Sequence, residues 1–393
     1  MKRIAINLGS GLVPGLDAVV AGAVRAAHGA GCEIVGIRNG YDGLLVGDRT
    51  LDDALVALDP RSMEDGGRGA WLGSAPRHDP FHLRVVTDDG LIDEADRSAE
   101  LLQSLAQAGI EGVISIVGAS AVTGLHALSV AFKLHRRGLR TVCIPKSVEN
   151  EVAGVPLAFG YDSVLANVAE SLQRIRAGAR EVGRLAVVEV PGRHAGWLAL
   201  QAGLASGADA VLIPEIAFEV AQLAAALDGR ERSGLRPALV VVAEGARAIE
   251  PAAVAAAVPD PLRASLAPNA DATLGQGQHV IDRSGAAAQA VAAALQQASG
   301  REVLPITLGL LSRGGPPTAV DRQLGLLYGA GAVRALLAGE DGVLMSWQSP
   351  QLRGVPIAEA LQRVRAVPLD GEFVRGARSL GIALGDGADA TPR

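Results

Sequence analysis

The chain has 393 residues, of which 49% are hydrophobic and 20% are charged. A length of this order predicts two domains, or three, with a large buried core. The formal net charge of −6 argues against a nucleic-acid-binding protein, because such proteins need positive surfaces for phosphates. Aromatic residues make up only 3% of the chain and glycines number 49, so we expect an aliphatic core and many turns.

The two cysteines, Cys32 and Cys143, lie at or beside predicted strands and lack the CxxC spacing of a metal or redox site. Buried, unpaired thiols are typical of a reducing compartment, so we expect the protein in the cytoplasm. Residues 114–132 contain no Asp, Glu, Lys or Arg, and such a stretch would be long enough for a membrane helix. Gly118 and Gly124 divide it into a strand, a turn and a helix start, so no membrane partner is expected.

In chain order, short β-branched strands alternate with helices of 3.6-residue periodicity. The strands are predicted at residues 3–6, 33–37, 112–117, 141–144, 185–190, 210–213, 238–243 and 303–308. The main helices are predicted at residues 16–29, 93–108, 125–137, 163–179, 197–205, 220–228, 284–298 and 324–338. This alternation predicts an α/β protein with largely parallel sheets.

Polar residues follow many of these strands at the carboxyl end, where open α/β sheets bind ligands. The groups are 9–11, 118–120, 146–151, 192–194, 244 and 312–315. Backbone N–H groups and cations can hold phosphates, while carboxylates can hold Mg²⁺ and accept the proton of an attacking hydroxyl. The pattern therefore predicts a phosphoryl-transfer site, in a cleft that all these strand ends would face. The competing interpretation is that the glycines only form turns and the charges only face solvent.

Segments in this order resemble the phosphofructokinase family, which includes ATP-dependent and pyrophosphate-dependent members. The most specific are VPGRHAGW from residue 190 and SRGGPPTAVDR from residue 312, and PKSVENE from residue 145 resembles the family's catalytic loop. The resemblance covers nearly the whole chain and implies two Rossmann-like, three-layer domains with mostly parallel sheets, of the phosphofructokinase type. It assigns residues 1–160 and 312–362 to a phosphate-donor domain, and residues 161–311 and 363–393 to a sugar-phosphate domain.

The resemblance also implies roles for residues that match the family's motifs. Glu149 would take the proton of the sugar hydroxyl, with Lys146 and Gly11 as further catalytic residues. Glu151 and Glu149 would hold Mg²⁺. The predicted donor-binding residues are Ser10, Gly11, Arg77, Gly118, Ser120 and Lys146. The predicted substrate-binding residues are Ser147, Glu149, Arg184, Pro191, Gly192, Arg193, Glu244 and Arg313.

Several positions depart from the family's usual pattern. Leu12 and Ala119 stand where carboxylates are usual, so we expect Mg²⁺ to be weakly held. Leu304 and Leu310 stand where an arginine and a histidine are usual on the acceptor side. Three hypotheses follow: a glycolytic kinase for the 1-hydroxyl of fructose 6-phosphate, a kinase with an altered acceptor, and a non-catalytic or regulatory paralogue that keeps the sugar-phosphate pocket.

The phosphoryl donor stays open between ATP and pyrophosphate. Lys146 matches the lysine of pyrophosphate-dependent members, whereas Ser120 stands where those members usually carry an aspartate that crowds out a nucleotide. The resemblance further implies a homodimer or a homotetramer.

Overall fold

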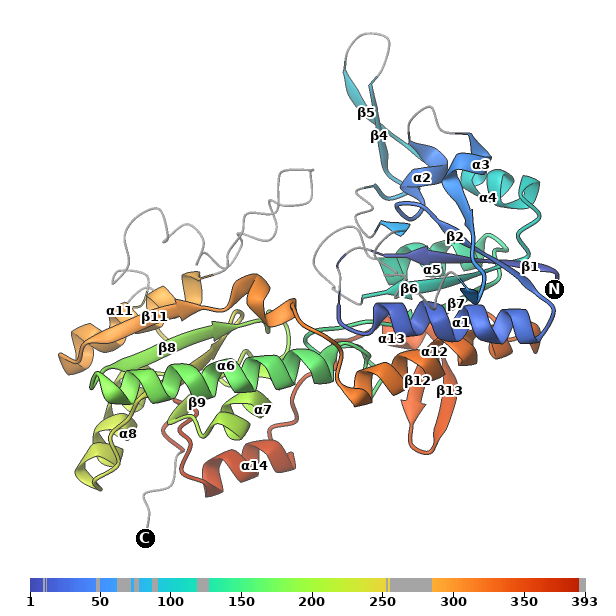
Figure 1. Cartoon of the computed structure of the whole chain (residues 1–393). Coiled ribbons are helices and arrows are strands. Elements are labelled where there is room, and N and C mark those ends of the chain that lie inside the picture. The colour runs from blue at the N-terminus through green and yellow to red at the C-terminus, as the bar shows by residue number, and fades with distance from the viewer. Residues whose placement is uncertain are drawn as a thin grey trace. The chain divides into compact units, whose positions relative to one another are not determined.

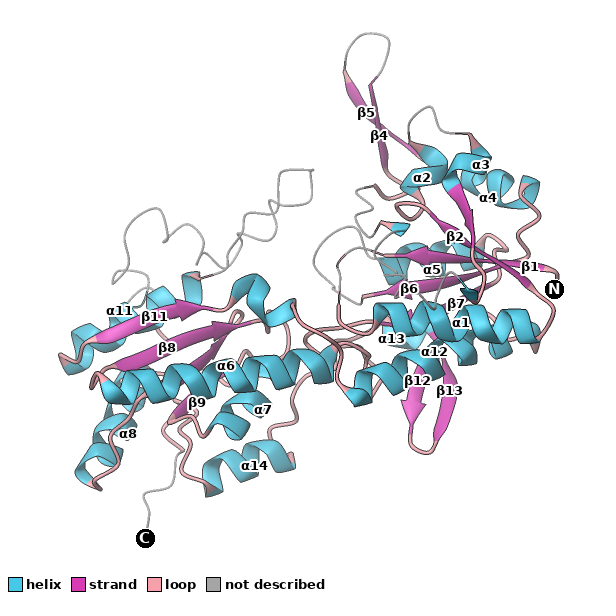
Figure 2. Cartoon of the chain, in the orientation of Figure 1, coloured by secondary structure: helices cyan, strands magenta, loops and turns pink. Residues whose placement is uncertain are grey.

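The computed structural model describes residues 1–9, 11, 13–46, 50–61, 72–73, 78–86, 91–118, 127–251, 254 and 285–388. Helices and strands alternate along the chain (Figures 1 and 2), and the α/β class predicted from the sequence is confirmed. Unit 1 comprises Met1–Ser147, Val152–Ser163 and Pro316–Val364, and unit 2 comprises Val148–Glu151, Val164–Gly315 and Arg365–Arg393. Whereas the sequence interpretation assigned residues 148–151 to the first domain, their contacts group them with unit 2, which therefore carries both predicted acids.

Unit 1 is built on a seven-stranded sheet in the order β13-β12-β7-β6-β1-β2-β3. The strands are β1 (Arg3–Leu8), β2 (Glu33–Ile37), β3 (Leu55–Ala57), β6 (Gly112–Val117), β7 (Thr141–Pro145), β12 (Val343–Gln348) and β13 (Gln351–Pro356). The five central strands are parallel, and the two edge strands β3 and β13 are antiparallel to their neighbours. A two-stranded hairpin, β4 (Leu83–Val86) and β5 (Ile92–Ala95), lies outside this sheet.

Helices cover both faces of the sheet because its strands are apolar on both sides. Helices α1 (Leu16–Gly29) and α12 (Ala319–Leu337) share a core with Ile4 and Ile6, while α4 (Ser98–Gln107) and α5 (Ala127–Arg136) share another core with Ala5. The backbones of α1 and α12 nearly touch, since a Cβ atom at Gly22 would lie 2.3 Å from the carbonyl oxygen of Leu326. The remaining helices are α2 (Asp42–Leu45), α3 (Leu51–Ala54) and α13 (Ile357–Ala360).

Unit 2 contains a four-stranded parallel sheet in the order β11-β8-β10-β9. The strands are β8 (Leu185–Val190), β9 (Ala210–Leu212), β10 (Leu239–Ala243) and β11 (Val303–Thr307). The helices are α6 (Tyr161–Glu181), α7 (Trp197–Ser206), α8 (Val220–Arg232), α11 (Ala286–Ser299) and α14 (Glu372–Ser379). A 3₁₀ helix, η5 (Gly309–Arg313), follows β11. Helices α8 and α11 share one core with the sheet, whereas α7 packs on β9 and β10 and in turn contacts α14. Among the described residues, no helix is long and apolar enough to cross a bilayer.

One buried carboxylate joins two distant segments of unit 1. Asp321, in the first turn of α12, accepts hydrogen bonds from the backbone N–H of Gly160 (2.8 Å) and of Ser163 (2.7 Å) and from the Ser163 hydroxyl (2.6 Å). The Ser163 hydroxyl in turn accepts the backbone N–H of Thr318 at 2.9 Å, and the Thr318 hydroxyl donates to Asp162 at 2.5 Å. The first turns of α6 and α12 thus cap each other, which satisfies N–H groups that a helix start leaves unpaired.

We expect Asp321→Asn to lower the free energy of unfolding of the protein by about 2 kcal/mol, because a buried charged acceptor of several hydrogen bonds is replaced by an amide. The urea midpoint at constant slope measures the loss. Asp341→Asn is the matched control, since Asp341 is exposed in the same unit. Equal midpoints for the two variants would contradict the capping role of Asp321.

Candidate functional site

Three predicted donor-side segments lie together at the carboxyl ends of central strands in the unit 1 sheet. Gly9 and Gly11 follow β1, Gly118 follows β6 and Lys146 follows β7. These strands are direct neighbours and parallel, so their carboxyl ends lie side by side. The Gly9 N–H donates to the carbonyl of Ile116 at 2.9 Å, which ties the first turn to β6. The sequence-predicted residues Ser10, Arg77 and Ser120, like Leu12 and Ala119, lie outside the described residues.

Lys146 organises the first of these turns. Its ammonium donates to the carbonyl oxygens of Gly9 (2.7 Å) and Gly11 (2.5 Å), and its side chain is almost fully buried. Burial lowers the pKa of Lys146 to about 7, because removal from water disfavours the charged form. Gly11 has a φ angle of +85°, a left-handed conformation that glycine adopts without strain. The lysine therefore fixes the shape of the turn that was predicted to hold a phosphate. The neighbouring Ser147, also buried, donates its N–H to the Phe159 carbonyl in the same unit.

Five of the predicted acceptor-side residues lie in unit 2 at the carboxyl ends of three neighbouring parallel strands. Pro191, Gly192 and Arg193 follow β8, Glu244 follows the adjacent β10, and Arg313 ends η5 after β11. The guanidinium of Arg193 donates twice to Glu244 Oε1, at 2.8 and 3.2 Å. Both side chains are partly exposed, so this ion pair offers donors and an acceptor to the hydroxyl groups of a ligand.

Glu149 joins this group directly. Its Oε2 atom accepts the backbone N–H of Arg193 at 3.0 Å, and the N–H of His194 also donates to this carboxylate. Burial first, and then the negative charges of Glu151 and Glu244, raise the pKa of Glu149 to about 8, while the two backbone donors oppose this shift. Glu149, Arg193 and Glu244, which were expected to face one site, therefore lie together in unit 2.

Other predicted acceptor-side positions differ in their surroundings. Arg184 precedes β8, so it lies at the opposite end of this strand from Arg193, and it pairs with Glu302 at 2.5 Å. Within unit 2 the structure therefore does not bring Arg184 to the Glu149 group. Arg313 is exposed, and so is Leu310 beside it, at 85% of the maximum. The η5 segment is held by the Asn167 amide, which donates to the carbonyls of Leu311 and Gly314.

Glu149 and Glu151 are the predicted metal ligands, and both belong to unit 2. The described residues contain no cluster of three or more His, Cys, Asp or Glu side chains suited to a metal ion. The two carboxylates nevertheless lie close enough for Glu151 to raise the pKa of Glu149, so a cation would relieve their repulsion. This donor set fits Mg²⁺, which is commonly bound by one or two carboxylates together with waters and substrate phosphates.

The sequence interpretation overlooked two residues that shape this site. Asn150 separates the two acids and has a φ angle of +58°, in the left-handed region, with its side chain buried. Asparagine tolerates this conformation better than most residues, so an asparagine between two glutamates could have indicated a left-handed residue at this point of the loop. Glu215, after β9, accepts the N–H of Gly196 at 3.0 and 3.1 Å and thereby fixes the start of α7. For Glu215, the position just after the strand predicted at residues 210–213 could have indicated a residue of the site.

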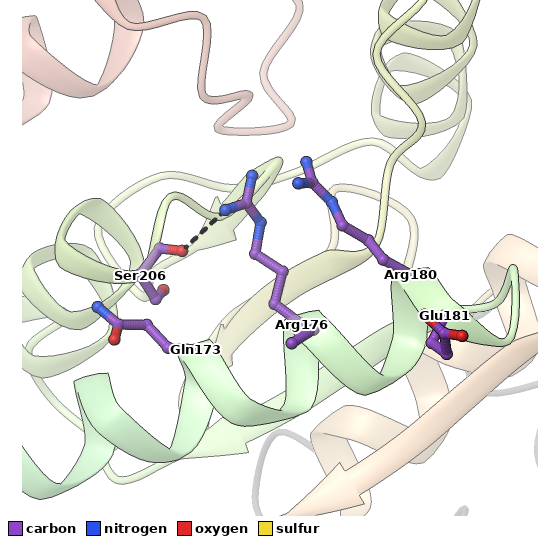
Figure 3. A pocket seen from close by; sticks show the side chains of 6 residues that line it. Gln173, Arg176, Arg180, Glu181 and Ser206 are labelled. Carbon is purple, nitrogen blue, oxygen red and sulfur yellow. Dashed lines mark hydrogen bonds between the residues drawn. The ribbon is translucent and has the colours of Figure 1, made fainter.

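A pocket of about 350 Å³ in unit 2 contains none of the predicted site residues. Figure 3 shows Arg176 and Arg180 projecting from α6 on the same side, with Ser206 of α7 opposite Arg176. The Arg176 guanidinium donates to the Ser206 carbonyl at 3.4 Å. Burial and then the positive charge of Arg180 lower the pKa of Arg176, against the attraction of Asp209. Ser206 ends α7, whereas Arg193 precedes its start, so the pocket and the Glu149 group lie toward opposite ends of this helix.

Comparisons with known proteins agree with one another. A family model described as phosphofructokinase matches residues 3–336. The chain is 34% identical over 388 residues to an ATP-dependent 6-phosphofructokinase of Chloroflexus aurantiacus, covering 98% of each chain. It is 32% identical over 376 residues to ATP-dependent 6-phosphofructokinase 2 of Streptomyces coelicolor, covering 94% of this chain and 97% of that relative. The solved structure of a pyrophosphate-dependent phosphofructokinase from Nitrosospira multiformis matches at a TM-score of 0.71 with 19% identity, covering 100% of this chain and 94% of that one, and so shares its fold.

We expect Glu149→Gln to stabilise the metal-free protein at alkaline pH. The raised pKa means that the folded state holds a proton that the unfolded state has lost, so the stability of the wild type falls as pH rises from about 4.5 to about 8. The glutamine variant has no charge to bury. Its advantage in unfolding free energy should be near zero at pH 5 and on the order of 1–2 kcal/mol at pH 8.5.

Urea unfolding in the presence of a chelator, at both pH values, measures this difference. Glu372→Gln is the control, because that side chain is 85% exposed in the same unit and should show no such pH dependence. A stabilisation that is the same at both pH values would contradict the titration of Glu149.

Proposed function

The chain belongs to the phosphofructokinase family, and we propose that it transfers the terminal phosphoryl group of ATP to the 1-hydroxyl of fructose 6-phosphate. The observation that carries the proposal is the Glu149 carboxylate, held by backbone N–H groups beside the Arg193–Glu244 ion pair. A carboxylate with a pKa near neutrality, next to groups that bind hydroxyls, suits the removal of a proton from a sugar.

In this proposal Glu149 accepts the proton of the attacking hydroxyl. The sugar oxygen then forms a bond to the terminal phosphorus of the donor, and the bond from that phosphorus to the leaving phosphate breaks. The two N–H donors from Arg193 and His194 orient the carboxylate and support its ionised form. Positioning and electrostatics supply most of the catalysis in such reactions, so the geometry of Glu149 is decisive.

The acceptor would be held by residues at the carboxyl edge of the unit 2 sheet. The Arg193–Glu244 pair would bind sugar hydroxyls, and the exposed Arg313 would bind the 6-phosphate. Arg184 is not included in this acceptor set, because within unit 2 it lies at the far end of β8. The leucines at 304 and 310 remain a reason to test other phosphosugars as acceptors.

We propose ATP rather than pyrophosphate as the donor. Relatives that are more than 30% identical over nearly the whole chain are named ATP-dependent, whereas the pyrophosphate-dependent protein is only 19% identical. In unit 1, Lys146 would contact the donor phosphate. An ammonium has three N–H donors, and among the described residues two of them bind Gly9 and Gly11. In this proposal the third would donate to a phosphate oxygen.

Glu149 and Glu151 would hold Mg²⁺ weakly, together with phosphate oxygens of the donor. When bound, the cation would neutralise charge on the phosphate oxygens during transfer. The non-catalytic alternative is not favoured, because relatives named as kinases match along the whole chain and Lys146, Glu149 and Arg193 are present. We further propose a homodimer or homotetramer in the cytoplasm, and the two buried, unpaired cysteines support a reducing compartment.

A coupled assay with fructose 6-phosphate and Mg²⁺, run separately with ATP and pyrophosphate, tests the reaction. We expect turnover with ATP, and Glu149→Gln should reduce kcat by roughly 10²–10⁴-fold because it removes the general base. The variant should still bind fructose 6-phosphate in a calorimetric titration. Glu372→Gln should leave kcat unchanged. Failure of the wild type with both donors would overturn the proposed activity, and an unchanged rate in Glu149→Gln would overturn only the role of this residue.

The metal assignment predicts a distinct result. Glu151→Gln should raise the Mg²⁺ concentration needed for half-maximal rate by roughly tenfold or more, since one of the few protein carboxylates is lost. Ala119→Asp restores a carboxylate that the family usually has and should lower that concentration. Titration of the rate with Mg²⁺ at saturating substrates measures both shifts. A wild-type response in both variants would argue against this site.

A further inference from the structure

The segment that re-enters unit 2 at Arg365 contacts the loop that carries both acids. The Arg365 backbone N–H donates to the Glu151 carbonyl at 2.8 Å, and its guanidinium Nη1 donates to the Asn150 carbonyl at 3.1 Å. From this arrangement we propose that Arg365 is a positioning residue, which holds the main chain of residues 149–151 so that the Glu149 carboxylate points at the acceptor. The inference rests on the proposed role of Glu149.

The loop needs an external support of this kind. Asn150 has left-handed backbone geometry, which asparagine tolerates better than most residues but which still costs more free energy than it does for glycine, so contacts that hold it stabilise the loop. Glu149 also lies among the negative charges of Glu151 and Glu244, and their repulsion favours any movement that separates the acids. A hydrogen bond from a guanidinium to the Asn150 carbonyl opposes such movement directly, because it fixes the peptide between the two acids.

Arg365 is itself anchored on the opposite side. Its guanidinium lies over the Trp197 ring at 3.9 Å from the ring centroid, and the Trp197 indole N–H donates to the Arg365 carbonyl at 2.8 Å. Trp197 is buried and is the first residue of α7. Two residues further on, the Val367 N–H donates to Glu215 at 2.8 Å, and the same carboxylate accepts the N–H of Gly196. The arginine thus connects the acid loop to the start of α7.

Arg365 thus links two parts of the acceptor site in unit 2, the loop of Glu149 and the turn before α7. Helix α7 directly follows the turn that contains Arg193 and His194, whose N–H groups bind Glu149. Arg365 therefore fixes the loop of Glu149 with respect to the helix that positions its hydrogen-bond donors. A displacement of about 1 Å in a catalytic group can reduce the rate about 100-fold, so the support has a measurable effect on catalysis.

The test is a comparison of Arg365→Met with Arg375→Met in the full-length protein. Arg375 lies in the same unit, on α14, in an exposed pair with Glu372. We expect Arg365→Met to reduce kcat roughly 10–100-fold with little change in the KM for ATP. Arg365→Lys keeps the charge but loses the planar fork and should regain only part of the rate. Arg375→Met should match the wild type. A kcat of Arg365→Met within twofold of wild type would overturn the inference.

A double variant separates positioning from a general structural role. If Arg365 acts through Glu149, adding Arg365→Met to Glu149→Gln should lower kcat no further, because the function that it supports is already lost. An additional loss in the double variant equal to that of the single variant would overturn the inference. Chemical rescue gives an independent readout: guanidinium at millimolar concentration should raise the kcat of Arg365→Ala but not of Glu149→Gln.

The result can be distinguished from failure of the proposed function. If Glu149→Gln keeps the wild-type rate, the role of Glu149 fails and the Arg365 proposal fails with it. If Glu149→Gln loses its rate while Arg365→Met keeps it, only the positioning role is wrong. Urea midpoints of all variants accompany the kinetics, and should Arg365→Met not fold, the double-variant comparison is made with Arg365→Lys, whose stem can still pack on Trp197.

Discussion

The structure of unit 1 depends on a carboxylate that has no access to solvent. Asp321 stands in α12 but caps α6, so it joins segments that are more than 150 residues apart in the chain. A buried charge is tolerated only when hydrogen bonds replace the water that it has lost, and here two N–H groups and one hydroxyl do so. Helix α12 packs closely on α1, which follows the turn at Gly9 and Gly11. The Asp321 cap therefore also fixes the start of α6 relative to α1.

The candidate site contains two further buried charges that backbone groups stabilise, one positive and one negative. In unit 1 a buried ammonium is compensated by the carbonyls of Gly9 and Gly11, and in unit 2 a buried carboxylate is compensated by the N–H groups of Arg193 and His194. In both places backbone dipoles replace water incompletely, so the pKa of each group moves toward neutrality. The burial of such charged groups lowers the stability of the protein, as is common at functional sites.

Much of this architecture follows from the sequence, because β-branched runs that alternate with amphipathic helices specify parallel sheets, and parallel strands bring their carboxyl ends to one edge. That reasoning placed Lys146 beside Gly11 and placed Glu149 with Arg193 and Glu244. It could not place Arg365, since an arginine after a helix has no local signature and its role arises from contacts with residues more than 160 positions away. Its assignment of Arg184 to the substrate stays a prediction, and within unit 2 this residue lies just before β8, at the opposite end of the strand from Arg193. The strands β12 and β13 were overlooked, being an antiparallel pair at the edge of a parallel sheet.

The interleaving of the two units has a consequence for synthesis of the protein. Unit 1 includes β12, which pairs with β7, and unit 2 includes the segment from Arg365 onward, which holds the acid loop. On the ribosome, the N-terminal part of unit 1 therefore emerges with one side of β7 and the face of α1 uncovered until nearly the whole chain has been made. Exposed strand edges and apolar helix faces promote aggregation. We expect nascent chains of this protein to depend on chaperones until their last segments emerge, even though each finished unit is well packed.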